Sequence, residues 1–130
     1  MKLLGIDFGK RKIGLSFSEG LLASPLSTIS VKTEKQVLAE VVFICNKLGI
    51  EKIVLGLSGG IHDKAAKEFG DNITKQTNLP VVFVDETLTS REAVAKMVEG
   101  KTSKKKRRVM EDSVAATIIL NSYLEENSKL

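Results

Sequence analysis

The first thirty residues alternate between apolar and polar positions in the way that is typical of paired strands. Residues 2–8, KLLGIDF, and residues 12–18, KIGLSFS, are two apolar runs joined by the three residues GKR. A glycine in so short a connection permits the tight turn of a β-hairpin. Residues 23–31, ASPLSTISV, predict a third strand, in which Pro25 should lie at the start of the strand or on an edge of the sheet.

The next segment has the spacing of an amphipathic helix. Thr33 and Gln36 match a capping box, which marks a helix start, and Gly49 supplies the stop. Between them, apolar residues recur at the three- and four-residue intervals that place side chains on one helix face. These residues are Val37, Leu38, Val41, Ile44, Cys45 and Leu48.

The rest of the chain alternates between short apolar runs and helical patterns. KIVLGLS at residues 52–58 and VVFV at residues 81–84 predict strands buried on both faces. A helix between them should bury a stripe formed by Ile61, Ala65, Phe69 and Ile73. Two further helices are expected, from about Ser90 to Glu99 and from about Met110 to Glu126.

This order of elements predicts the fold class. An antiparallel meander followed by alternating helices and strands gives an α/β fold with a mixed five-stranded sheet and helices on both faces. The 130 residues are most simply one domain, residues 1–130.

Composition narrows the class of protein. The chain is 42% hydrophobic and 28% charged, as in soluble globular proteins, and no apolar run approaches the roughly 20 residues needed to span a bilayer. The single cysteine, Cys45, permits no internal disulfide, and its place in a helical apolar pattern predicts a buried thiol. We therefore expect a reducing, cytoplasmic setting and no membrane partner.

Positive charge is concentrated in one segment. Residues 101–108, KTSKKKRR, hold six basic residues, and without them the balance changes from 20 basic against 16 acidic residues to 14 against 16. We expect a basic, mobile loop that binds a polyanion. A solvated charge run and a nuclear import signal remain alternative interpretations.

Four acidic residues fall at the ends of predicted strands and helices. Asp7 lies near the end of the first strand, Asp85 and Glu86 follow VVFV, and Asp112 extends the apolar stripe of the last helix. Ligands gather at the carboxyl ends of parallel strands in such sheets. Converging buried carboxylates repel one another, and a divalent cation removes that cost. Taken singly, each residue can equally be a turn, loop or helix-start residue.

Four segments together resemble the YqgF/RuvX family of Holliday junction resolvase-like proteins and pre-16S rRNA nucleases, which have an RNase H-like fold. The resemblance spans nearly the whole chain, with the segments in the family's order. They are LGIDFGKRKIGLSFS, IEKIVLGLS, VVFVDETLTSREA and MEDSVAATIILNSYLE.

The resemblance implies a metal-dependent active site. Asp7, Glu86 and Asp112 match the family's acidic residues and would be catalytic and bind metal, with Asp85 as a further candidate ligand. Two Mg²⁺ or Mn²⁺ ions, about 4 Å apart in sites of this kind, would be held with substrate bound. Arg11 matches a family residue that would contact backbone phosphate.

The implied function is hydrolysis of nucleic-acid phosphodiester bonds in the 5′-end processing of pre-16S rRNA. The partner would be structured RNA or branched DNA, and the protein a monomer or a weak homodimer. Lys10, Arg11 and Lys12 would contact backbone phosphates together with the basic loop. The loop residues of this set are Lys104, Lys105, Lys106, Arg107 and Arg108.

Other functions stay open. The chain could be a Holliday junction resolvase acting on branched DNA, or a nucleic-acid-binding module without catalysis. GIDFGKRKIG also looks like the first phosphate loop of actin-like ATPases, but those proteins need two lobes and 130 residues provide one.

The segment Gly56–Gly60 departs from the family, which usually has Gly-Leu-Pro and a longer glycine-containing loop. Two glycines without a following Lys-Ser/Thr are a weak signal for a phosphate cradle. His62, where this loop enters the helix, should be a solvent-exposed helix-start residue, with a substrate contact as the alternative.

Overall fold

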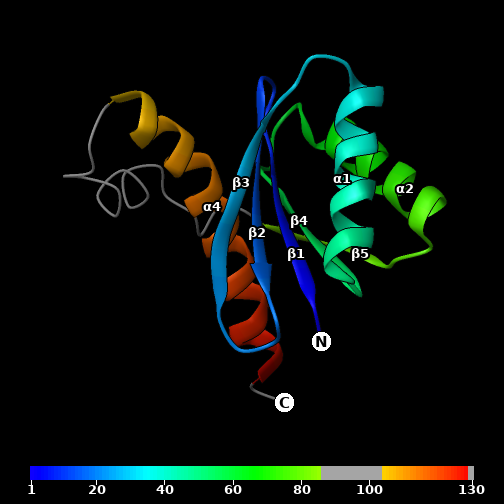
Figure 1. Ribbon diagram of the computed structural model, residues 1–130, viewed down its shortest axis with the longest axis vertical. Helices are drawn as coiled ribbons and strands as arrows, with labels where there is room; N and C mark the ends of the chain where they lie inside the picture. The colour runs from blue at the N-terminus through cyan, green and yellow to red at the C-terminus, as the bar shows by residue number, and fades with distance from the viewer. Residues whose placement is uncertain (86–103, 129–130) are drawn as a thin grey trace.

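The computed structural model describes residues 1–85 and 104–128, with side chains for residues 1–85 and 113–127. In these ranges the chain forms five strands and three helices (Figure 1). The strands are β1 (Leu3–Phe8), β2 (Lys12–Ser18), β3 (Ala23–Ser30), β4 (Lys52–Leu57) and β5 (Val81–Asp85). The helices are α1 (Glu34–Leu48), α2 (Asp63–Thr77) and α4 (Lys104–Ser128).

The strands form one mixed sheet in the order β3-β2-β1-β4-β5. Strand β2 is antiparallel to both β1 and β3, whereas β4 is parallel to both β1 and β5. Helices α1 and α2 cover one face and α4 covers the other (Figure 1). The predicted α/β class, with a five-stranded mixed sheet and helices on both faces, is therefore confirmed.

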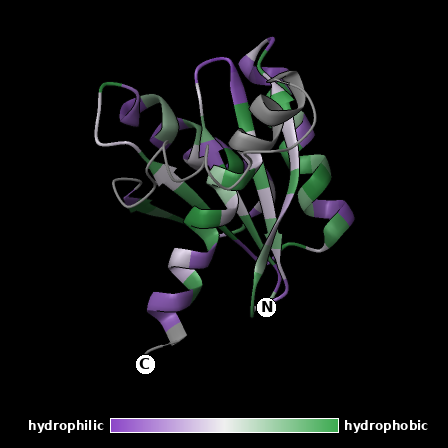
Figure 2. Cartoon of the chain, turned by 90° about the vertical axis from the view of Figure 1, so that its left-hand side faces the viewer, coloured by the Kyte–Doolittle hydropathy of each residue, from purple (hydrophilic) through white to green (hydrophobic). Residues whose placement is uncertain are grey.

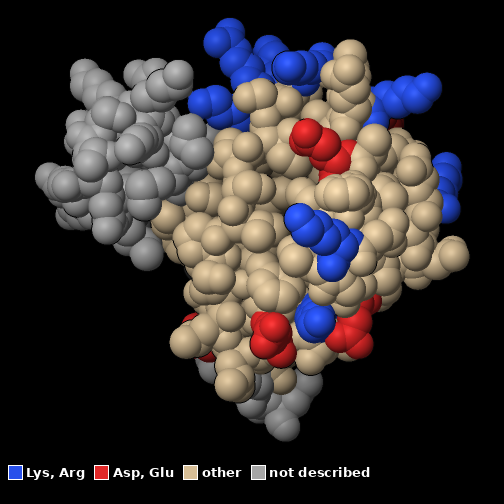
Figure 3. All heavy atoms as spheres, viewed as in Figure 1, with Lys and Arg blue, Asp and Glu red and all other residues tan. Residues whose placement is uncertain are grey.

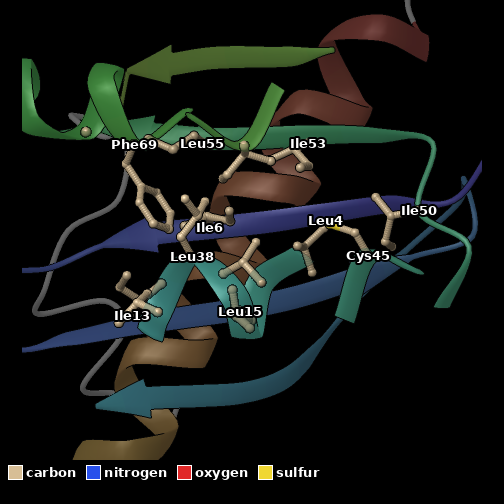
Figure 4. Packing of buried hydrophobic residues seen from close by; sticks show 14 residues of the cluster. Leu4, Ile6, Ile13, Leu15, Leu38, Cys45, Ile50, Ile53, Leu55 and Phe69 are labelled. Carbon is tan, nitrogen blue, oxygen red and sulfur yellow. The ribbon is translucent and has the colours of Figure 1, made fainter. Parts of the chain in front are cut away.

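Alternation along β1 divides the core between the two faces. Leu4 and Ile6 belong to the larger cluster, which packs against α1 and α2 (Figure 4). Leu3 belongs to a smaller cluster with Ile119 and Leu120 of α4. Colouring by hydropathy shows the apolar residues along the strands and the hydrophilic last turns of α4 beyond them (Figure 2). The central strand therefore presents its odd-numbered residues to α4, and we call this side of the sheet the α4 face.

Helix α1 begins and ends where the sequence predicts. The Thr33 side chain accepts a hydrogen bond of 3.2 Å from the backbone N–H of Gln36, and Gly49 ends the helix in the left-handed conformation, with φ of 67°. Glycine adopts this conformation without the steric cost that a Cβ imposes. The N-cap and C-cap signals are therefore both confirmed.

The predicted apolar stripe of α2 is partly wrong. The helix begins at Asp63, so Ile61 precedes it and is 90% exposed, and Ala65 is exposed as well. The buried residues of this helix are Ala66, Phe69, Gly70 and Ile73. Two successive alanines fit either face equally well, so the sequence pattern does not fix which of them is buried.

Helix α4 begins at Lys104, not near Met110, so residues 104–108 form its first turns and their assignment to a loop is wrong. Lysine and arginine are good helix formers, and neither glycine nor proline interrupts residues 101–128. Residues 101–103 and the helix predicted from about Ser90 to Glu99 lie outside the described residues. None of the helices that the structure describes has the length and apolar content needed to cross a membrane.

Candidate active site

Asp7 lies near the carboxyl end of the central strand and is only 5% exposed. Its partners in the sheet are Gly14 of β2 and Gly56 of β4. Residues paired across neighbouring strands point to the same face. Asp7 therefore has the only side chain at these three adjacent positions, and it is a carboxylate on the α4 face.

The α4 face is closely packed two residues before Asp7. A Cβ on Gly5 would collide with Ser16 Oγ and would lie 3.0 Å from the backbone oxygen of Ala116. Ser16 Oγ also donates a buried hydrogen bond of 2.7 Å to that oxygen. The glycine therefore allows the backbone of α4 to approach β1 and β2 at this level.

Helix α4 runs from the carboxyl end of β1 toward its amino end. Tyr123 accepts a hydrogen bond of 3.2 Å from Lys52 Nζ, and Lys52 pairs with Leu3 at the start of β1. Ala116 is at the level of Gly5, and Asp112 precedes Ala116 by about one helical turn. The backbone of Asp112 therefore lies toward the end of the sheet that holds Asp7. The start of α4 is at the same end of the molecule as the β1–β2 connection (Figure 1).

The other two predicted acidic residues are at the end of β5. Val84 of β5 pairs with Gly56 of β4, which in turn pairs with Asp7, so Val84 and Asp7 point to the same face. Val84 packs against the cluster beneath α4. Asp85 is the next residue, so alternation places it on the opposite face, where it is exposed. The structure therefore does not bring Asp85 onto the face of Asp7, and Glu86 lies outside the described residues.

The described side chains include no group of three or more His, Cys, Asp or Glu residues that could hold a metal ion. Of the three predicted ligands, only Asp7 has a described side chain. The carboxylate of Asp7 is buried and has a glycine on each side in the sheet. This environment fits a residue that contributes one oxygen ligand to a cation.

Basic residues occupy the turn that follows Asp7. Lys10 and Arg11 are exposed, and Lys12 is half-buried at the start of β2. A Cβ on Gly9 would collide with the carbonyl oxygen of Lys12, so a larger residue would open this turn. Lys and Arg side chains gather at this end of the molecule (Figure 3). The backbone of residues 104–108 forms the first turns of α4.

Asp63, an acidic residue outside the predicted site residues, closes the β4–α2 loop. The Asp63 carboxylate accepts hydrogen bonds from Ser58 N at 3.1 Å and from Gly59 N at 3.0 and 3.2 Å, and Ser58 Oγ donates a further one at 3.3 Å. The Gly59 N–H that a phosphate cradle would use already serves this carboxylate. His62 is exposed at the start of α2, as expected for a helix-start residue. An aspartate in the first helical turn after Ser-Gly-Gly was the available sequence signal.

The cysteine does not take part in this arrangement. Cys45 is buried in α1, and burial raises the pKa of its thiol to about 11. The thiol is therefore protonated near neutral pH, which makes it a poor nucleophile and a poor metal ligand.

Comparison with known proteins identifies related sequences. Residues 1–126 match the family model described as "RuvX: Holliday junction resolvase". A Clostridium botulinum protein named "Putative pre-16S rRNA nuclease" is 38% identical, with 99% of this chain and 100% of that protein covered. A Clostridium kluyveri protein of the same name is 36% identical, again with 99% of this chain and 100% of that protein covered.

Solved structures show the shared fold. Thermus thermophilus RuvC has a TM-score of 0.67 at 18% identity, covering 99% of this chain and 97% of that one. The same protein in complex with a Holliday junction substrate has a TM-score of 0.64 at 20% identity, covering 98% and 96%. The fowlpox virus Holliday junction resolvase has a TM-score of 0.66 at 14% identity, covering 97% and 99%. The chain therefore has the RNase H-like fold of these resolvases.

Proposed function

This chain belongs to the RuvX family, and on that premise we propose that it is a divalent-metal-dependent nuclease that processes the 5′ end of pre-16S rRNA. The reaction is hydrolysis of a phosphodiester bond at the carboxyl end of β1. The full-length similarity to relatives named as pre-16S rRNA nucleases supports the substrate.

The observation that carries the proposal is the position of Asp7. Carboxylate oxygens are the ligands that Mg²⁺ and Mn²⁺ prefer in proteins. Asp7 is buried on the central strand between Gly14 and Gly56, so neither adjacent strand places a side chain directly beside its carboxylate. This position suits a residue that holds a cation against a substrate.

We assign Asp7, Glu86 and Asp112 as metal ligands and catalytic residues. The backbone path of α4 toward the end of β1 that holds Asp7 supports the choice of Asp112. Asp85 is the weaker candidate, because alternation along β5 places it on the opposite face. Two Mg²⁺ or Mn²⁺ ions, when bound, would supply activation of the attacking water and stabilisation of the leaving oxygen.

Basic residues position the substrate, and the packing of α4 on the sheet positions Asp112. Lys10, Arg11 and Lys12 bind backbone phosphates and so orient the strand at Asp7 without reading its sequence. The basic residues at 104–108 precede Asp112 on the same helix, and we assign them the same role. The contact between α4 and the sheet at Gly5 holds the Asp112 backbone in place relative to β1.

A second candidate function is the resolution of Holliday junctions in branched DNA. The description of the matching family model favours it. Resolution by paired cuts would require two active sites and hence a homodimer, whereas trimming of RNA ends is possible for a monomer. For rRNA processing we propose a cytoplasmic monomer or weak homodimer, in keeping with the free thiol of Cys45.

The test is a cleavage assay with a pre-16S-like RNA, a four-way DNA junction and a linear duplex, each with Mg²⁺, Mn²⁺ or EDTA. Asp7→Asn removes the carboxylate charge at nearly constant size, and Asp71→Asn makes the same change at an exposed position of α2. We expect metal-dependent cutting of the RNA that Asp7→Asn abolishes and Asp71→Asn retains. Preferred cutting of the junction would establish the second candidate. Binding without cutting by both the wild-type protein and Asp7→Asn would contradict a nuclease and leave a binding module.

A further inference from the structure

Two connections at the Asp7 end of the sheet form one continuous surface. The β1–β2 turn contains Lys10 and Arg11, and the β3–α1 connection follows Ser30. The Arg11 carbonyl accepts a hydrogen bond of 2.8 Å from the N–H of Val31. Lys12 and Ser30 are paired in register just below this bond. The two connections are therefore held side by side by backbone contacts.

Both connections carry exposed cations. Lys32 lies in the β3–α1 connection and Lys35 in the first turn of α1, and both side chains are exposed like those of Lys10 and Arg11. Glu34 is an exposed acidic residue between the two lysines, so the positive charges exceed the negative ones on this surface. The concentration of Lys and Arg at this end is visible in Figure 3.

Within the described part of the chain, neither Lys32 nor Lys35 forms a salt bridge. Exposed lysines that are not paired within the protein keep their charge available to an anionic partner.

We propose that the phosphate-binding surface continues from the β1–β2 turn onto the β3–α1 connection, where Lys32 and Lys35 bind backbone phosphates of the nucleic acid remote from the cleaved bond. This inference rests on the proposed function, because it extends the binding surface of the same site.

The register of the sheet sets the distance of these phosphates from Asp7. Gly14 of β2 pairs with Asp7 on one side and with Thr28 of β3 on the other, so Thr28 lies two strands away from Asp7 at the same level. Lys32 is four residues after Thr28 along the chain. Strand β3 ends at Ser30, two residues beyond Thr28. With about 4.8 Å between strands and about 3.3 Å per residue, Ser30 lies roughly 10 Å to the side of Asp7 and roughly 7 Å beyond it, and Lys32 follows two residues later. This separation corresponds to several nucleotides of backbone, so the lysines bind a flanking segment or the opposite strand of the substrate.

The first test is the salt dependence of binding to a double-stranded pre-16S-like RNA. The double variant Lys32→Ala/Lys35→Ala is compared with Lys47→Ala, an exposed lysine in the last turn of the same helix, at its opposite end. Two lost phosphate contacts should weaken binding at least tenfold at 0.1 M salt and reduce the slope of log K against log salt by about 1.8. Lys47→Ala should change neither quantity.

A second measurement uses RNA of different lengths. The double variant and the wild-type protein should bind a short RNA, trimmed to the two nucleotides on each side of the cut, with equal affinity. The affinities of the two proteins should differ only for the longer RNA. An unchanged salt slope, or an equal loss of affinity on both lengths, would overturn the inference.

The failures of the two proposals are distinguishable. Metal-dependent cutting with an unchanged salt slope would contradict the role of Lys32 and Lys35 and leave the nuclease standing. A protein that cuts none of the substrates yet shows the reduced slope in the double variant would contradict the nuclease and leave this binding surface standing.

Discussion

Ser16 Oγ in β2 donates a buried hydrogen bond of 2.7 Å to the backbone carbonyl of Ala116 in α4, one hundred residues further along the chain. The bond crosses from the sheet to the helix at the level of Gly5, where the missing side chain allows close approach. It fixes α4 against the sheet about one turn after Asp112 and so connects the fold to the proposed active site.

Ser16→Ala should lower the free energy of unfolding by about 1–2 kcal/mol, because a buried carbonyl loses a hydrogen-bond partner. Urea denaturation measures this change. The matched control is Ser24→Ala in β3, where the serine is exposed. This variant should have nearly the same free energy of unfolding as the wild-type protein. Equal stability losses in the two variants would show that the bond to Ala116 contributes nothing specific.

Gly5→Ala should destabilise the protein by about 2 kcal/mol through overpacking, because the new Cβ meets Ser16 Oγ and the Ala116 carbonyl. The loss should be smaller in the Ser16→Ala background, since the hydroxyl that it collides with is absent. A double-mutant cycle measures this coupling. Strictly additive losses would argue against the collision with Ser16.

Asp63→Ala should release the β4–α2 loop. The carboxylate accepts the N–H groups of Ser58 and Gly59, so its removal should speed hydrogen exchange of these two amides at least tenfold. The bonds are exposed to solvent, and the loss of global stability should be only about 1 kcal/mol. Asp63→Asn keeps one acceptor oxygen and should retain part of the protection, whereas Asp71→Ala on the same helix should leave it unchanged. Unaltered exchange at Gly59 in Asp63→Ala would contradict the role of the carboxylate.

The buried thiol predicts a pH dependence of stability. The pKa of Cys45 is raised from 9.0 to about 11 in the folded protein, so its contribution to stability is fully present below pH 9 and is lost as the pH rises toward 11. Wild-type protein should therefore lose more stability than Cys45→Ala between pH 9 and pH 11. At pH 8 the native thiol should react slowly with iodoacetamide and rapidly once urea unfolds the chain. Parallel pH profiles of the two proteins would contradict the shifted pKa.

Local signals in the sequence predicted much of the fold. Thr33 with Gln36 and the stop at Gly49 bounded α1, because caps depend on neighbouring residues only. The interpretation failed where local signals are ambiguous. Ala65 and Ala66 both suit a buried or an exposed position, and the basic residues before Met110 offer no signal against helix.

The candidate site was only partly predictable for a related reason. Asp7 was recognised as a carboxylate in an apolar strand, but its two glycine partners are far apart in sequence and meet only through the register of β1 with β2 and β4. The placement of Asp85 on the opposite face likewise depends on the pairing of Val84 with Gly56. Register is a property of the assembled sheet, and no short segment encodes it.

The central position of β1 has a consequence for how the proposed site responds to heat and denaturant. Strand β1 is paired on both sides, with β2 and with β4, whereas β3 forms an edge of the sheet. Local openings of a protein begin at edges and termini, and doubly paired core strands open last, together with the whole molecule. Like β2 and β4, β1 is paired on both sides, so we expect the backbone of Asp7 to open only when the whole molecule unfolds.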